Sequence, residues 1–252
     1  MEEAYALELI QNGKRIDGRK FDEFRPIEIK VNSIHTAEGS ARVKMGETEV
    51  LAGVKMDVGT PFPDRPDEGI LIINSEFTPL SSPDFESGPP SEDAVELSRI
   101  VDRGIRESCA IELDKLSLVP GEKVLSTFID IHILNHQGNL QDAAALAAVT
   151  ALKNARIPKV ENVKVVRGEW EKPLPIAYTP INVTVCKVGN AFIVDPNYKE
   201  EQVVDAKLSI SVRDDDKICA LQKQGTKELK VEDIEKMLDI AIEKSKELRK
   251  LI

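Results

Sequence analysis

The sequence lacks the long apolar segments of membrane proteins. Apolar runs in its 252 residues, such as ILII at 70–73, fall far below the roughly 20 residues that a bilayer-spanning helix needs. The first twenty residues begin with acidic side chains and are interrupted by charge, whereas a secretory signal has a basic start and an apolar centre. We therefore expect a cytoplasmic protein that does not contact a membrane.

Cysteine and histidine are scarce and lack the spacing of a metal site. Cys109, Cys186 and Cys219 form no CxxC pair, which suits a reducing compartment. His132 and His136 would share one face of a helix, as zinc ligands can, but the alternating apolar residues around them indicate a strand. On a strand they would lie about 13 Å apart, too far to share one ion. We expect no metal and no cofactor.

A surplus of positive charge is also missing. The formal net charge is −10, which argues against a protein that coats nucleic acid non-specifically, because phosphate neutralisation needs clustered Lys and Arg. A local basic patch is still compatible with this balance. Aromatic residues are few, but 41% hydrophobic and 31% charged residues are typical of a soluble globular chain rather than a disordered one.

The order of the expected elements is strands first and helices after, in two successive blocks. This order predicts an α+β fold, with mixed sheets and packed helices in one domain over residues 1–252 and approximate halves 14–157 and 158–252. Ser91, followed by two acidic residues, is typical of a helix start. The expected helices cover about 3–12, 92–113, 140–155 and 231–250. The expected strands cover 27–31, two runs flanking 45–48, 69–77, 122–135, 163–168, 180–188, 191–195, 206–213 and 217–222.

Three arginines follow one stripe of the helix after Ser91. Arg99, Arg103 and Arg106 stand at i, i+4 and i+7, so their guanidinium groups project from the same side. Guanidinium groups suit phosphate because their planar fork supplies paired donors. The alternative is a solvated face in which Glu96 pairs with Arg99 and Asp102 pairs with Arg106. Spacing alone favours this alternative.

A glycine turn and a strand mouth are two further candidate positions. Gly138-Asn139-Leu140 links an apolar strand to an alanine-rich helix, and a helix start of this kind attracts anions. The turn itself offers no hydroxyl group and no cation to complete a phosphate site. Asp205 precedes the strand KLSISV, where a carboxylate can act as a general acid or base if a substrate lies against it.

Six stretches carry a resemblance to a known family. They are RIDGRKFDEFRPI, EGSARVKMGETEV, SGPPSEDAVELSR, GNLQDAAALAAVTAL, DPNYKEEQVVDAKLSISV and LQKQGT. In this order they resemble the RNase PH family of phosphorolytic exoribonucleases over about residues 14–250. The resemblance implies a fold of two β/α halves similar to the second domain of ribosomal protein S5, and assembly into six-membered rings. It also implies attack of inorganic phosphate on the 3′-terminal phosphodiester of RNA.

The resemblance further implies that the phosphate site is degenerate. Active members carry Gly-Ser-Arg where this chain has Gly138-Asn139-Leu140, and paired arginines where it has Glu92 and Asp93. Two carboxylates would repel a dianionic nucleophile. The resemblance matches Asp205 to the family's catalytic aspartate, but without a phosphate pocket it has no group to protonate usefully. We expect no catalytic residue in this chain.

The segment ELSRIVDRGIRES is similar to that of the non-catalytic RNase PH-like subunit of archaeal exosomes. This similarity implies that Arg99 and Arg103 bind single-stranded RNA at the cleft of a catalytic partner subunit, with Arg106 on the same stripe. The implied partners are that catalytic subunit, in an alternating hexamer, and cap proteins with RNA-binding domains. One rival is an active phosphorolytic nuclease that uses Asp205 and a ligand such as Lys207. Another is an assembly protein that does not bind RNA.

Overall fold

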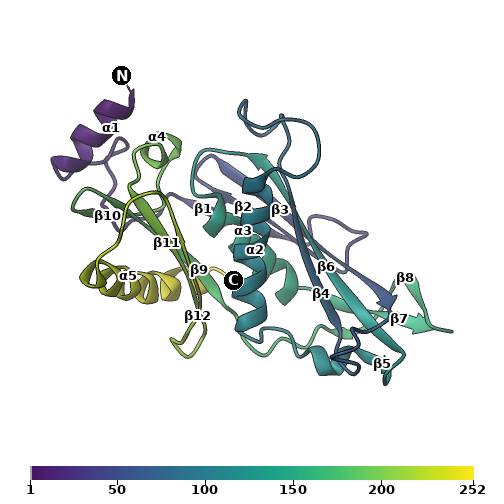
Figure 1. The fold of residues 1–252 in the computed structure, drawn as a ribbon. Coiled ribbons are helices and arrows are strands. Elements are labelled where there is room, and N and C mark those ends of the chain that lie inside the picture. Colours follow the sequence, from purple (N-terminus) through teal and green to yellow (C-terminus); the bar gives the residue numbers. More distant parts are fainter. Residues whose placement is uncertain (1) are drawn as a thin grey trace.

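The structure is a computed structural model that describes residues 2–252, and its elements form two large sheets, a separate two-stranded sheet, and helices between and beside the large sheets (Figure 1). The helices are α1 (Glu2–Gln11), α2 (Glu92–Glu107), α3 (Leu140–Lys153), α4 (Tyr198–Glu201) and α5 (Val231–Arg249), with a 3₁₀ turn over Leu113–Leu116. The strands are β1 (Ile27–Val31), β2 (Gly39–Met45), β3 (Thr48–Gly59), β4 (Ile70–Glu76), β5 (Ser117–Val119), β6 (Lys123–Asn135), β7 (Arg156–Glu161), β8 (Lys164–Pro173), β9 (Ile181–Val188), β10 (Ala191–Val194), β11 (Ala206–Val212) and β12 (Ile218–Gln224).

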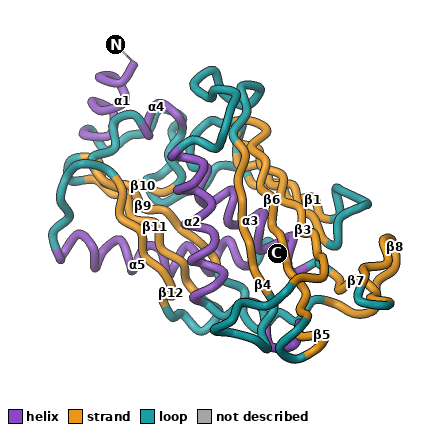
Figure 2. Tube along the Cα trace, turned by 45° about the vertical axis from the view of Figure 1, so that its right-hand side comes forward, coloured by secondary structure: helices purple, strands orange, loops and turns teal. Residues whose placement is uncertain are grey.

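Each half of the chain contains one large sheet, which is mixed in the first half and antiparallel in the second. The first has the order β1-β2-β3-β6-β4, with β5 paired to β6, and β4 runs parallel to β6 while the other pairs are antiparallel. The second has the antiparallel order β10-β9-β11-β12. Helices α2 and α3 contact strands of both sheets and lie between them, as Figure 2 shows from a second direction. The α+β class predicted from the sequence is confirmed.

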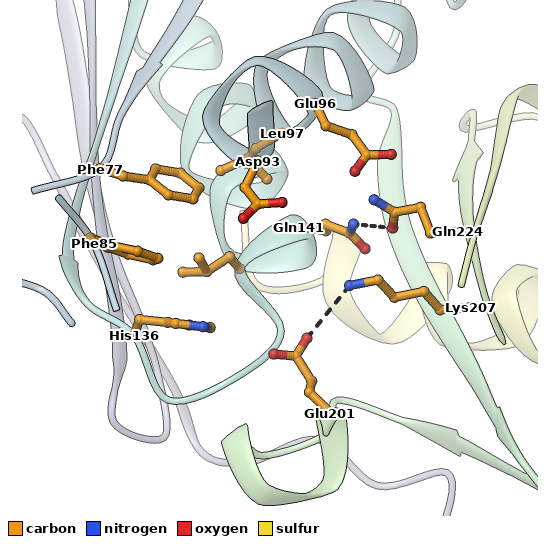
Figure 3. A pocket seen from close by; sticks show the side chains of 11 residues that line it. Phe77, Phe85, Asp93, Glu96, Leu97, His136, Gln141, Glu201, Lys207 and Gln224 are labelled. Carbon is orange, nitrogen blue, oxygen red and sulfur yellow. Dashed lines mark hydrogen bonds and ion pairs between the residues drawn. The ribbon is translucent and has the colours of Figure 1, made fainter. Parts of the chain in front are cut away.

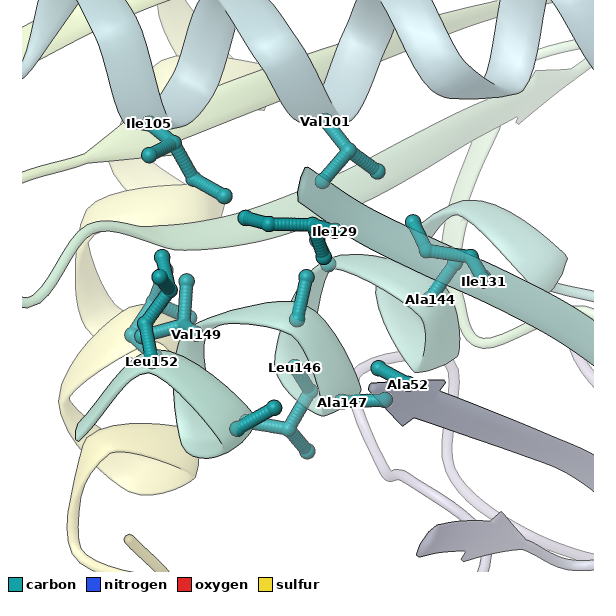
Figure 4. Close-up of a cluster of buried hydrophobic side chains, with 14 of the residues drawn as sticks. Ala52, Val101, Ile105, Ile129, Ile131, Ala144, Leu146, Ala147, Val149 and Leu152 are labelled. Atoms are coloured by element: carbon teal, nitrogen blue, oxygen red, sulfur yellow. The ribbon is translucent and has the colours of Figure 1, made fainter. Parts of the chain in front are cut away.

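Helix α3 is the centre of the core because it is buried on all sides. Every residue from Leu140 to Leu152 is buried, and small alanine side chains let the neighbouring elements approach closely (Figure 4). Gly39 on β2 shows how close this approach is, since a Cβ atom there would lie 2.4 Å from the carbonyl oxygen of Ala151. The last turn of α3 is therefore packed tightly against the first sheet.

The helix after Ser91 ends earlier than the sequence predicts. It ends at Glu107 rather than near Leu113, because Cys109 adopts a left-handed conformation with φ of 54°. The N–H groups of Cys109 and Ala110 then donate to the carbonyl oxygens of Arg106 and Ile105, the pattern of a Schellman stop. Glycine usually marks such a stop, so a cysteine hides it from sequence reasoning.

The segment between the halves also differs from expectation. The structure contains β7, which the sequence analysis does not predict, and β8 extends to Pro173 instead of ending near residue 168. The two strands pair only with each other, as a hairpin. The two prolines and the largely exposed side chains of β8 weaken the alternation of apolar and polar residues that would predict these strands. The division into halves at residue 157 stays a prediction.

Candidate functional site

A small cavity lies where the start of α3 meets the first turns of α2 and the strands β11 and β12. Its volume is about 200 Å³ (Figure 3). Of the residues assigned from the sequence to the degenerate phosphate site, Asp93 and Leu140 line this cavity together. Glu92 instead lines the neighbouring hollow formed by the loop over residues 77–91. The structure thus brings together part of the expected degenerate phosphate site and leaves Glu92 beside it.

The glycine turn before α3 is shaped by tight packing. Gly138 has φ of 93°, and a Cβ atom there would lie 2.4 Å from the carbonyl oxygen of Pro196, so only glycine fits. Asn139 follows in the left-handed conformation with φ of 54°. Its backbone N–H donates to Oε1 of Glu201 at 3.2 Å. The chain's own carboxylate therefore occupies the position at the helix start where an external anion would bind.

Side chains behind the turn lock it in place. Asp195, which is fully buried, accepts hydrogen bonds from Asn139 and Arg25 and pairs with Arg19 at 3.0 Å. Burial alone would raise the pKa of Asp195, but the hydrogen bonds and charge of Arg25 hold it below its usual range. Arg25 also donates to the carbonyl oxygen of Gly138 at 3.1 Å. The turn is therefore filled by hydrogen bonds within the chain and is not an open anion-binding site.

A second buried carboxylate anchors α3 to the other half. Asp142 is completely buried and accepts hydrogen bonds from Asn139, from Asn182, and from both the backbone and the hydroxyl group of Thr184. Burial raises the pKa of Asp142 to about 6, and these four donors only partly offset it, since none of them carries a charge. Because Asn182 and Thr184 lie on β9, this network ties the helix start to the second sheet.

The lining of the cavity carries more negative than positive charge. Asp93, Glu96 and Glu201 contribute three carboxylates, and Lys207 contributes one cation, 3.9 Å from Glu201 (Figure 3). Within residues 2–252, the carboxylates of Asp93 and Glu96 have no ion-pair or hydrogen-bond partner. Carboxylates that line so small a cavity repel a dianion and raise the free energy of its bound state. The arrangement therefore opposes phosphate binding.

Aromatic rings form the opposite wall of the cavity. Phe85 stacks on His136 with ring centroids 5.5 Å apart, and Phe77 lies 4.6 Å from Phe85. Burial lowers the pKa of His136, so this ring adds no positive charge for an anion at neutral pH. Tyr198 packs edge-on against His136 and donates its hydroxyl hydrogen to Asp84, which fastens the loop over residues 77–91. Phe77 and Phe85 come from one loop, His136 follows β6 and Tyr198 begins α4, so no sequence spacing indicates that the rings form one wall.

Asp205 does not reach the cavity. Its carboxylate accepts a hydrogen bond from the N–H group of Gly189 at 2.7 Å and pairs with Lys227 at 2.6 Å. Burial works to raise the pKa of Asp205, but Lys227 and Gly189 hold it below its usual range, so the group stays ionised. Asp205 precedes the first residue of β11 and turns toward a different hollow, whereas Lys207, two residues later, faces the cavity. Strand alternation would have placed both on one face.

The three arginines of the stripe on α2 differ in their contacts. Arg99 is exposed and has no partner within residues 2–252, so the expected pair with Glu96 is absent. Arg103 is exposed and donates to the side-chain oxygen of Gln222 at 3.0 Å. Arg106 pairs with Asp102 at 2.6 Å, as the solvated-face alternative predicts, and also donates to the carbonyl oxygen of Leu71 at 2.9 Å. Two of the three guanidinium groups therefore keep an uncompensated charge.

Metal-site and membrane signatures are absent from the described part of the chain. No three His, Cys, Asp or Glu residues within 2–252 are arranged to hold an ion. Over the same residues, no helix combines the length and the apolar character needed to cross a bilayer. His132, one of the two histidines weighed as zinc ligands, lies 3.3 Å from Glu76 instead.

Family models match both halves of the chain. The model of the 3′ exoribonuclease family, domain 1, matches residues 23–158, and the model of domain 2 of the same family matches residues 178–244. The two matches follow the two sheets, since the first contains β2, β3, β4 and β6 and the second contains β9 to β12. Sequence family and observed architecture are consistent.

Individual proteins resemble the chain over nearly its full length. It is 50% identical over 250 residues to the exosome complex component Rrp42 of Thermococcus gammatolerans, which covers 98% of this chain and 92% of the relative. A chain in a structure of the Archaeoglobus fulgidus exosome with RNA bound to the active site superposes with a TM-score of 0.93 at 46% identity, covering 99% of this chain and 96% of that one. A chain of an archaeal exosome core gives a TM-score of 0.88 at 44% identity, with coverages of 98% and 94%.

Proposed function

The chain belongs to the 3′ exoribonuclease family, also called the RNase PH family, and from this premise we propose that it is a non-catalytic ring subunit of an archaeal exosome. In this role it alternates with a catalytic RNase PH-like subunit in a hexamer that degrades RNA from the 3′ end in the cytoplasm. Its own contribution is to build the ring and to hold single-stranded RNA at the partner's active site.

The observation that carries this proposal is the occupied start of α3. The backbone N–H of Asn139 already donates to Glu201, and Asp93 and Glu96 add unpaired negative charge to the same cavity. Phosphorolysis needs a bound inorganic phosphate and stabilisation of the charge that develops on its oxygens. A site that repels the nucleophile cannot supply either, so the reaction must take place on another subunit.

The RNA-holding part of the proposal rests on Arg99 and Arg103. Both are exposed, and no carboxylate of residues 2–252 neutralises either of them. Such guanidinium groups bind backbone phosphates without reading sequence, which suits an enzyme complex that must accept successive nucleotides. Arg106 is excluded from this role because Asp102 already compensates its charge.

The partners follow from the relatives. The similar structures are exosome assemblies, and one of them holds RNA at the active site. We extend this assembly to the present chain and add cap proteins with RNA-binding domains as further partners. With a net charge of −10, the chain itself would bind RNA only through a local patch such as the arginine stripe.

A phosphorolysis assay tests the proposal directly. A 5′-labelled oligoadenylate is incubated with the purified chain, with the catalytic partner subunit, and with the two together, each with and without inorganic phosphate. We expect no shortening by this chain alone and phosphate-dependent release of ADP by the mixture. Release of ADP by the chain alone, abolished by Asp205→Asn, would instead establish the active-nuclease alternative and overturn the proposal.

A further inference from the structure

Helix α2 packs closely against the second sheet at Gly104, where there is no room for a larger side chain. Gly104 is buried against β11, and a Cβ atom there would lie 2.7 Å from the hydroxyl oxygen of Ser211. That hydroxyl group is already engaged, because it donates to Asn182. The short distance between the backbones brings the preceding residue of α2, Arg103, within reach of the neighbouring strand β12.

Arg103 uses this proximity to contact Gln222. The guanidinium Nη1 donates to the amide oxygen of Gln222 at 3.0 Å, across a sequence separation of 119 residues. Gln222 is half-buried on β12, where it pairs in register with the buried Ser209 of β11, so its own position is fixed by the sheet. The contact therefore joins the long, flexible side chain of Arg103 to β12, whose position the sheet fixes.

The side-chain chemistry of Gln222 affects the charge of Arg103 as much as its position affects the direction of Arg103. An amide oxygen accepts a hydrogen bond but carries no net charge, so Arg103 keeps its full attraction for phosphate. Arg106 shows the contrary case on the same helix, since the carboxylate of Asp102 holds it with two hydrogen bonds and cancels its charge. Arg99 has neither restraint nor compensation within residues 2–252.

We infer that Gln222 is a positioning residue that aims Arg103 at the RNA backbone without neutralising it, so that the second half of the chain contributes to RNA binding. The inference rests on the proposed function. A restrained guanidinium loses less side-chain entropy when phosphate binds than a free one does. Five donors in a planar fork also leave Arg103 with free N–H groups while one of them is held by Gln222.

The test uses substitutions at Gln222 in the assembled ring with its catalytic partner. Binding of a labelled oligoadenylate is measured in phosphate-free buffer, where phosphorolysis cannot proceed, at two or more salt concentrations. Gln222→Glu should pair with Arg103 and weaken binding roughly tenfold, as Arg103→Ala does, because both remove one available cation. Gln222→Ala should weaken binding about two- to threefold but keep the salt dependence of the wild type, since it removes only the restraint.

Controls separate this inference from the function on which it rests. Gln11→Glu adds the same charge on α1, away from α2 in Figure 1, and should bind like the wild type. Sedimentation of each variant verifies that the ring is intact. If Arg103→Ala binds RNA normally, the proposed RNA-holding function fails. If Arg103→Ala is weakened but Gln222→Glu or Gln222→Ala matches the wild type, the positioning role of Gln222 is overturned.

Discussion

The start of α3 and the outer face of α2 are two regions of this molecule that could attract phosphate. The chain's own groups occupy the first region and leave the second available. At the start of α3, Glu201 accepts the backbone N–H that an anion would use, and Lys207 is held beside it. On α2, Arg99 and Arg103 remain without an anionic partner among residues 2–252. A helix end or an arginine is a phosphate site only where the protein's own charges leave it unoccupied.

The two regions also differ in how they are built into the fold. The turn before α3 is buried and is held by Asp195, Arg25 and Asp142, whose partners come from both halves. On α2, Arg99 and Arg103 are exposed, and within residues 2–252 the side-chain amide of Gln222 is the only group that holds either of them. We therefore expect substitutions in the first region to change stability and substitutions in the second to change RNA binding.

The largest effect is expected for Asp195→Ala at the buried turn. The substitution leaves Arg25, Arg19 and Asn139 without their shared acceptor, and an uncompensated buried charge of this kind costs about 3–5 kcal/mol. Thermal or urea unfolding of the purified chain measures the loss. Asp67→Ala, at an exposed carboxylate, is the matched control and should change stability by less than about 0.5 kcal/mol. Equal stability of the two variants would contradict a structural role for the turn.

A smaller effect is expected when Arg99 and Arg103 are both replaced by alanine. The stability of the chain should stay within about 0.5 kcal/mol of the wild type, while RNA binding by the assembled ring weakens by about 2–3 kcal/mol. The salt dependence should also fall, because about 0.7 counterions are released per contacted phosphate of a single strand. Arg106→Ala is the control and should bind RNA normally, since Asp102 already compensates its charge. Unchanged affinity of the double variant at moderate salt would remove the RNA-holding role.

The smallest effect concerns the protonation of Asp142. Its folded pKa of about 6 lies above the ordinary value of 3.8, so the folded state holds this proton more tightly than the unfolded state does. Stability from this group is therefore fully present below about pH 4 and is lost as pH rises through 6. We expect a loss of about 1 kcal/mol between pH 5 and pH 7. Unfolding of the wild type and of Asp142→Asn at both pH values isolates the contribution, and an equal pH dependence of the two would contradict it.

Sequence reasoning succeeds where the signal is local. The α+β class, the alanine-rich helix, the glycine turn at Gly138 and the arginine spacing on α2 all depend on contacts within a few residues. The resemblance to the RNase PH family is confirmed by models that match residues 23–158 and 178–244. The sequence does not indicate the early end of α2, because Cys109 takes the left-handed conformation that glycine usually supplies.

The direction of Asp205 could not be read from the sequence either. Its place before a strand suggests an acid that faces a substrate, but the side chain binds Gly189 in the turn between β9 and β10 and Lys227 in the segment after β12. A residue just before a strand is not bound by the alternation that governs the strand itself. Lys207, which lies inside β11, obeys that alternation and reaches the cavity.

The sequence by itself determined the fold class, the family and the residue types at the degenerate site, because each depends on local patterns or on motifs in a fixed order. Only the tertiary structure decided which charges remain available. Glu201 meets Asn139 across 62 residues of chain, and Gln222 meets Arg103 across 119. Such pairings arise from the packing of α2 and α3 between the two sheets, and no periodicity in the sequence records which side chains the folded chain will place together.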